Sequence, residues 1–198
     1  MRITQSILPY FRLQQGGTIA FIGAGVAWAP IPFLSHYSAS KAALDMFVEG
    51  LHKEVRDQNI RCTIFELGGF ASQLGLPREG SDEGFGKFQP AIRDYEGLFS
   101  KAMDVFAKEI APNIPGDVVK MANAIVDMVK GEGAAKERKL PVRVVLGSDA
   151  LKLVTQKCQE QLGLSNEFED ISLSTDRDDL GQVSHEGMLR LTSMLGRP

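Results

Sequence analysis

The sequence is poor in cysteine, histidine and surplus positive charge. Its net charge of −3, from 22 basic and 25 acidic side chains, leaves no basic excess for binding the phosphates of nucleic acid. Cys62 and Cys158 lie in apolar patterns without the spacing of metal ligands, so we expect both to be small core residues rather than a disulfide. The three histidines are scattered along the chain. These scarcities disfavour a disulfide scaffold, a metal centre and a nucleic-acid partner.

The sequence also lacks a long uninterrupted apolar segment. The longest apolar run, residues 19–34, is shorter than the ~20 residues of a membrane-spanning helix and contains two glycines and two prolines. No apolar segment with a small-residue cleavage site follows Met1, so a signal peptide is not indicated. We therefore expect a cytoplasmic protein with no membrane partner.

Helical and strand patterns alternate along most of the chain. The spacing predicts helices over residues 3–14, 38–58, 91–110, 117–131 and 148–162, the last one capped by Ser148 and Asp149. Short apolar runs predict buried strands over residues 18–22, 60–65 and 142–146. This order predicts an α/β fold with a Rossmann-like, doubly wound parallel sheet that is incomplete, with about three strands. We expect this domain to occupy residues 1–164 and an acidic, mobile extension to occupy residues 165–198.

The helix predicted over residues 38–58 has the clearest two-sided pattern. Its apolar stripe consists of Leu44, Phe47, Val48, Leu51 and Val55. The opposite face, which we expect to meet solvent, carries Asp45, Glu49, His52 and Arg56. The preceding segment, residues 23–36, is rich in glycine and proline and predicts a loop.

Tyr37 and Lys41 begin this helix and are the strongest candidates for chemistry. Residues four apart lie on one helix face, so the ammonium can stabilise the phenolate form of Tyr37. A phenol tuned in this way can give a proton to a carbonyl oxygen or take one from an alcohol. Taken alone, the same spacing is also that of a helix start with a surface lysine.

The order of these motifs resembles the second half of the classical short-chain dehydrogenase/reductase family, with features of fungal-type members. The resemblance rests on a strand, a Gly/Pro loop, the Tyr37-Ser38-Ala39-Ser40-Lys41 motif, a helix, a strand and then Leu67-Gly68-Gly69-Phe70-Ala71-Ser72. It implies that Tyr37 and Lys41 are catalytic, that Lys41 also contacts the nicotinamide ribose, and that Ser72 binds near the nicotinamide amide. It further implies NADP or NAD as cofactor, a small-molecule substrate and a homodimer.

The chain departs from the family pattern at several positions. The serine that usually stands thirteen residues before the tyrosine is replaced by Ala24, so a hydrogen-bond donor to the reacting oxygen is missing. The usual Pro-Gly-Pro turn is replaced by Leu67-Gly68-Gly69, and we expect the loss of two prolines to loosen this turn. Trp28, Phe33 and Phe70 either line an apolar pocket near the site or belong to the core.

The glycine-rich turn that receives the pyrophosphate in this family is not found in the sequence. Gly23-Ala24-Gly25 follows a strand but does not serve, because Trp28 takes the third glycine's place and two prolines prevent a helix from starting there. We expect the chain to be truncated at its N-terminus, with Met1 an internal methionine of a longer ancestor. Either the protein was shortened in evolution or the reading frame was started late.

The expected function is an oxidoreductase acting on a carbonyl or alcohol of a small apolar metabolite, by family resemblance. One alternative is a cofactor-independent isomerase, dehydratase or cyclase that uses Tyr37 and Lys41 for proton transfer, with no cofactor at all. A second alternative is a non-catalytic binding partner of a full-length relative. A half sheet leaves a strand edge and apolar helix faces uncovered, so we expect a homodimer through the helix faces of Ile3 and Leu44.

Overall fold

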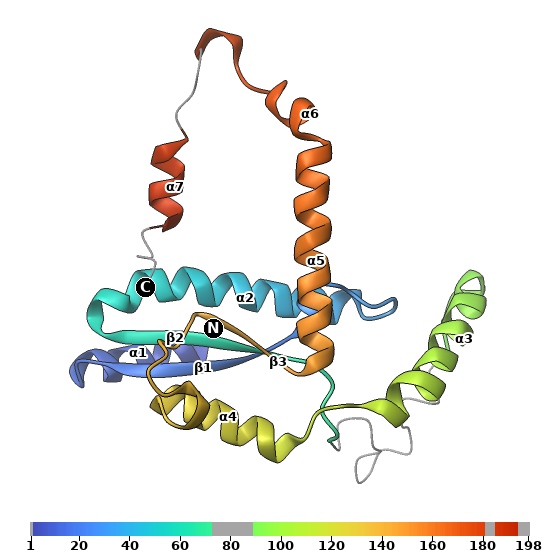
Figure 1. Cartoon of the computed structure of the whole chain (residues 1–198), viewed down its shortest axis with the longest axis horizontal. Coiled ribbons are helices and arrows are strands. Elements are labelled where there is room, and N and C mark those ends of the chain that lie inside the picture. The colour runs from blue at the N-terminus through green and yellow to red at the C-terminus, as the bar shows by residue number, and fades with distance from the viewer. Residues whose placement is uncertain (1, 73–88, 181–184, 194–198) are drawn as a thin grey trace.

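Three parallel strands form the sheet at the centre of the computed structural model (Figure 1). The structure describes residues 2–72, 89–180 and 185–193. The strands lie in the order β1 (Gly17–Ala24), β2 (Ile60–Leu67) and β3 (Arg143–Leu146), and both pairs are parallel. The register joins Ala24 to Leu67 and Leu67 to Leu146, so the three carboxyl ends are level at one edge. The prediction of an α/β fold with a three-stranded parallel sheet is confirmed.

Helices cover both faces of this sheet. Figure 1 shows α2 and α4 on opposite sides of it, while α5 starts at the carboxyl end of β3 and stands away from the sheet. The helices are α1 (Arg2–Leu13), α2 (Ser35–Val55), α3 (Glu96–Val105), α4 (Val118–Lys130), α5 (Ser148–Glu167), α6 (Glu169–Leu173) and α7 (Glu186–Ser193). No helix in the described segments is both long and apolar enough to cross a membrane.

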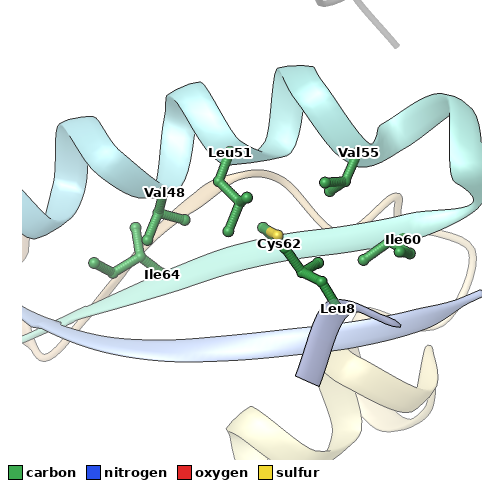
Figure 2. Packing of buried hydrophobic residues seen from close by; sticks show 7 residues of the cluster. All are labelled: Leu8, Val48, Leu51, Val55, Ile60, Cys62 and Ile64. Carbon is green, nitrogen blue, oxygen red and sulfur yellow. The ribbon is translucent and has the colours of Figure 1, made fainter. Parts of the chain in front are cut away.

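The core lies between α2, α1 and the facing side of β1 and β2. Alternate residues of β2 point to one face, and the three that point to α2 are fully buried. Residues of α2 spaced three or four apart meet them, because this spacing keeps side chains on one helical stripe. Figure 2 shows the cluster, which consists of Leu8, Val48, Leu51, Val55, Ile60, Cys62 and Ile64. The predicted apolar stripe of this helix is confirmed.

The ends of α4 follow from the residues beside it. The carboxylate of Asp117 accepts hydrogen bonds from the backbone N–H groups of Val119 and Lys120 at 2.8 and 3.0 Å. The bond from Lys120, followed by that from Val119, lowers the pKa of Asp117. Gly131 ends the helix in the left-handed region, with φ of 72°. Both boundaries agree with the sequence.

Helix α5 differs from the prediction at both ends. Gly147 is its N-terminal capping residue and no side chain caps it, so the predicted capping role of Ser148 and Asp149 is wrong. The helix continues to Glu167 rather than ending near residue 162. It therefore crosses the boundary predicted at residue 164, and the division into a domain and an acidic extension stays a prediction.

Several predicted burials are also wrong. Asp45, expected on the solvent face of its helix, is only 1% exposed. Cys158, expected in the core, is exposed, because α5 leaves the sheet after its first turns (Figure 1). Helix α3 is shorter than residues 91–110, and its apolar side chains Leu98 and Val105 are about half exposed.

The sheet has an open edge and an uncovered apolar helix face, as the sequence predicts. Within the described ranges, β1 pairs with β2 on one side only. Helix α1 buries Thr4 and Leu8 against the core. A second stripe of the same helix is exposed, and it consists of Ile3, Ile7, Tyr10 and Leu13.

The core predicts a large difference between two substitutions on α2. Leu51→Ala removes a side chain that is 7% exposed and leaves a cavity, so it should lower the free energy of unfolding by about 2–5 kcal/mol. Met46→Ala, where the side chain is 57% exposed, should change it by less than about 1 kcal/mol. Urea denaturation followed by circular dichroism measures both. Equal losses would contradict this core.

Candidate functional site

The start of α2 brings Tyr37 and Lys41 to the carboxyl end of β1. The Lys41 ammonium donates a hydrogen bond to the backbone carbonyl of Ile22 at 3.0 Å. In this position its nitrogen lies 5.8 Å from the centre of the Tyr37 ring. The Tyr37 side chain is 45% exposed, so a ligand can reach its hydroxyl group. The structure therefore places the two predicted residues together, with the lysine held by the strand.

The hydroxyl groups near this pair do not replace the missing serine. Ala24 is buried at the end of β1, in extended backbone, and presents only a methyl group. Ser40 donates its hydroxyl to the carbonyl of Tyr37 at 2.7 Å, so it serves the helix itself. Ser38 is buried and its hydroxyl oxygen has no hydrogen-bond partner in the described structure. The site thus has one phenol and one ammonium, without a second hydroxyl at the serine position.

The turn after β2 is braced by hydrogen bonds. The backbone N–H of Gly69 donates to the carboxylate of Asp149 at 2.6 Å, and that of Gly68 donates to the carbonyl of Leu146 at 2.8 Å. A bridge then joins Phe70 to Gly116, with two backbone hydrogen bonds of 3.0 Å around it. The prediction that the loss of two prolines loosens this turn is therefore wrong.

Asp149 requires the glycines that surround it. A Cβ atom added to Gly68 would clash with the Asp149 carboxylate, and one added to Gly147 would lie 2.8 Å from it. Ser72 is exposed and follows this braced segment at the end of the first described range. The sequence gave Asp149 only a capping role. Its real contact joins residues 80 positions apart, which no local pattern signals.

Arg143 on β3 gathers three carboxyl groups above the same end of the sheet. Its guanidinium binds Asp45 and Glu49 of α2 at 2.9 Å each, and its Nε donates to Glu66 of β2 at 2.8 Å. Its Nη2 also contacts Glu66. Trp28, in the segment between β1 and α2, donates its indole N–H to Glu66 at 3.0 Å and stacks on the guanidinium at 4.4 Å.

Burial and charge shift the proton equilibria of this cluster. Burial, and then the neighbouring Glu66 carboxylate, raise the pKa of Asp45 to about 7, although Arg143 opposes them. Burial disfavours the charged form of Arg143, but hydrogen bonds to Glu66 and Glu49 outweigh it and raise the pKa of the guanidinium. Sequence reasoning missed the cluster. The available signal was a charged residue inside each of two otherwise apolar strands.

The aromatic residues that the sequence left undecided have different surroundings. Trp28 is half-buried against Arg143, and Phe70 is half-buried in the bridge to Gly116. Phe33 is 42% exposed, and its ring packs edge-to-face on Tyr95 and Phe99. Trp28 and Phe70 therefore have structural contacts, while Phe33 belongs to a small aromatic cluster with the segment around α3.

Other reactive side chains are engaged in the structure. Burial raises the pKa of the Cys62 thiol to about 11, which keeps it protonated and unreactive. His52 accepts a hydrogen bond from the backbone of Cys62 at 3.2 Å, so its predicted place on a solvent-facing side is wrong. Burial, and then the charge of Arg56, lower the pKa of His52. In the described parts of the chain, no three metal-ligating side chains converge.

The described residues fit one end of a nicotinamide dinucleotide. Tyr37 and Lys41 lie at the carboxyl edge of the sheet, where ligands bind in open α/β folds. The glycine that follows β3 and precedes α5 does not offer a phosphate site. The place beside Gly147 is taken by the carboxylate of Asp149, which would repel an anion. The nicotinamide ribose is therefore accommodated here, and the pyrophosphate is not held by this turn.

Comparisons with known proteins agree on one family. The family model described as short chain dehydrogenase matches residues 1–80. The NADPH-dependent 1-acyldihydroxyacetone phosphate reductase of Saccharomyces cerevisiae is 38% identical over 71 residues, which are 36% of this chain and 24% of that protein. Dehydrogenase/reductase SDR family member 7B of Mus musculus is 25% identical over 149 residues, which are 69% of this chain and 46% of that protein.

A solved structure extends the likeness beyond residue 80. The crystal structure of a short-chain dehydrogenase from Streptomyces avermitilis aligns with a TM-score of 0.68 and 28% identity. It covers 89% of this chain and 59% of that one. The chain thus spans less than half the length of the two curated relatives. Its fold, its motif order and its matching segment agree, and the chain belongs to the short-chain dehydrogenase/reductase family.

Proposed function

We propose that this chain carries the proton-transferring half of an oxidoreductase that acts on a carbonyl or alcohol group of a small, apolar metabolite. The observation that supports it most directly is the hydrogen bond of Lys41 to Ile22, which holds the ammonium beside Tyr37 at the sheet edge. The yeast relative is named as an NADPH-dependent reductase, which favours NADPH or NADH as the cofactor.

In this proposal each site residue has one task. Tyr37 exchanges a proton with the reacting oxygen, and Lys41 stabilises the phenolate and contacts the nicotinamide ribose. Ser72, after the braced turn, contributes a hydroxyl near the nicotinamide. The cofactor supplies the hydride when it is bound. Ala24 provides no second donor to the oxygen, which should make the reaction slower than in a relative that has a serine there.

The cofactor-independent alternative and the non-catalytic alternative are less favoured. The named relatives are reductases and dehydrogenases, and none of their names describes an isomerase, dehydratase or cyclase. The exposed hydroxyl of Tyr37 and the positioned Lys41 also favour proton transfer over a purely structural role.

A second copy of the chain is the partner we propose. The exposed stripe of α1 carries Ile3 and Leu13, which are 86% and 83% exposed, so it offers an apolar surface to a matching one. Leu44 contributes less than the sequence suggests, because it is partly buried against the core of its own chain.

Replacing Tyr37 tests proton transfer. Tyr37→Phe should lower kcat by about 10²–10⁴-fold in NADPH oxidation with an acyldihydroxyacetone phosphate as the probe ketone, because the transferable proton is removed. Tyr10→Phe, on the exposed stripe of α1, should leave kcat unchanged. Activity that persists in Tyr37→Phe would refute the catalytic role of the phenol.

Cofactor binding is tested by energy transfer from Trp28, the single tryptophan of the chain, to NADPH. Lys41→Ala should weaken the binding about tenfold, because it removes a charge-assisted hydrogen bond to the ribose. Lys53→Ala, three turns further along α2, is the matched control and should bind NADPH as the unaltered chain does. An absence of transfer at millimolar NADPH or NADH would exclude the redox function for this chain.

The oligomeric state is tested by light scattering after size exclusion. The unaltered chain should elute as a dimer, and Ile3→Glu combined with Leu13→Glu should shift it to a monomer, because buried charges oppose association. Leu162→Glu on α5, where the side chain is also exposed, should keep the dimer. A stable monomer of the unaltered chain would refute this interface.

A further inference from the structure

The cluster around Arg143 has more carboxyl groups than cations. Asp45 and Glu49 come from α2 and Glu66 comes from β2, while Arg143 on β3 is the cation that binds all three. The side chains of Asp45 and Glu66 are each 1% exposed, so water does not screen their mutual repulsion. Two carboxylates that share one guanidinium nitrogen cannot both keep a full charge at low cost.

The hydrogen bonds show which carboxyl group keeps the charge. Oε1 of Glu66 accepts from Nε and Nη2 of Arg143 and from the indole N–H of Trp28. Asp45 receives one bond from Arg143 at its Oδ2, while its Oδ1 is buried with no partner in the described structure. An oxygen with several donors favours the anion, and an oxygen without a donor favours the protonated acid.

No other element adds a charge to this balance. Beside Asp45, β1 presents Gly23, where even a Cβ atom would come within 3.2 Å of Oδ1. The segment after β1 adds the neutral ring of Trp28. Within α2, Glu49 is 30% exposed and adds a further negative charge beside Arg143. The neighbours of Asp45 thus offer one cation against two other carboxyl groups.

We propose that Asp45 and Glu66 form a carboxyl pair that holds a single proton, and that this proton fixes Trp28 and the segment leading to Tyr37. Trp28 lies nine positions before Tyr37, and it is tied to the pair by its hydrogen bond to Glu66. Asp45, Glu66 and Arg143 are then positioning residues. Loss of the proton leaves two buried anions on one guanidinium and weakens its stacking on Trp28.

The direction of the pH dependence follows from the site of the proton. Burial and Glu66 raise the pKa of Asp45 to about 7, above its value of 3.8 in an unfolded chain. Stability that depends on this proton is therefore complete below that unfolded value and is lost as pH rises through about 7. A simple Asp–Arg pair would show the opposite direction.

Trp28 emission tests the pair without any assay of activity. In the full chain, emission should change in one proton-linked step with a midpoint near pH 7, because the indole rests on Glu66 and Arg143. Asp45→Asn should abolish this step and keep the low-pH spectrum at all pH values. Asp57→Asn, at the exposed end of α2, should titrate as the unaltered chain does.

Stability gives a second readout of the same pair. The thermal unfolding midpoint of the unaltered chain should fall as pH rises through about 7, and that of Asp45→Asn should not. Glu66→Gln removes the charged acceptor and should shift Trp28 emission even at low pH. A flat titration of the unaltered chain, an unchanged step in Asp45→Asn, or an Asp45→Asn chain that fails to fold would each overturn the proposal. None of these outcomes depends on the proposed oxidoreductase activity.

Discussion

The seating of α2 on β1 and β2 determines everything that the chain presents at the carboxyl edge of its sheet. Val48, Leu51 and Val55 lie over Ile60, Cys62 and Ile64, as Figure 2 shows. Each fully buried side chain of this kind contributes about 1.5–3 kcal/mol. The stripe fixes the rotation of the helix, since any turn about its axis would expose these residues. The direction of Tyr37 and Lys41, one to three turns earlier, is therefore set by a core that takes no part in the chemistry.

The same seating carries a polar residue into the interior. Lys41 and Asp45 are one turn apart on α2, and Val48 follows on the same side of the helix. The strip that leads from the site into the core thus passes through Asp45. Burying a carboxyl group there is costly, and Arg143 from the neighbouring strand offsets the cost only in part. The proton-transfer pair and the buried network are therefore held by one helix and respond to the same backbone.

The features that the sequence predicted correctly are local ones. Strands β1 and β2 and helix α2 follow from periodicities of two and 3.6 residues, which need no knowledge of distant partners. Asp45 was misplaced because a polar residue beside an apolar stripe looks solvent-facing until its partner is known. That partner, Arg143, lies 98 positions away. Cys158 was misplaced for the converse reason, since an apolar pattern does not become a core where the helix has no sheet to cover it.

The turn after β2 shows that a departure from the family pattern need not be a loss. A proline fixes the backbone by its ring and has no N–H to donate. In this chain the N–H of Gly69 is the donor that Asp149 accepts, and Gly68 leaves the room which that carboxylate fills. A proline at position 69 would therefore leave a carboxylate without its donor, and Asp149 would have no counterpart there. The glycines and Asp149 make sense only together, so the segment that leads to Ser72 is held by a different device of comparable function rather than left loose.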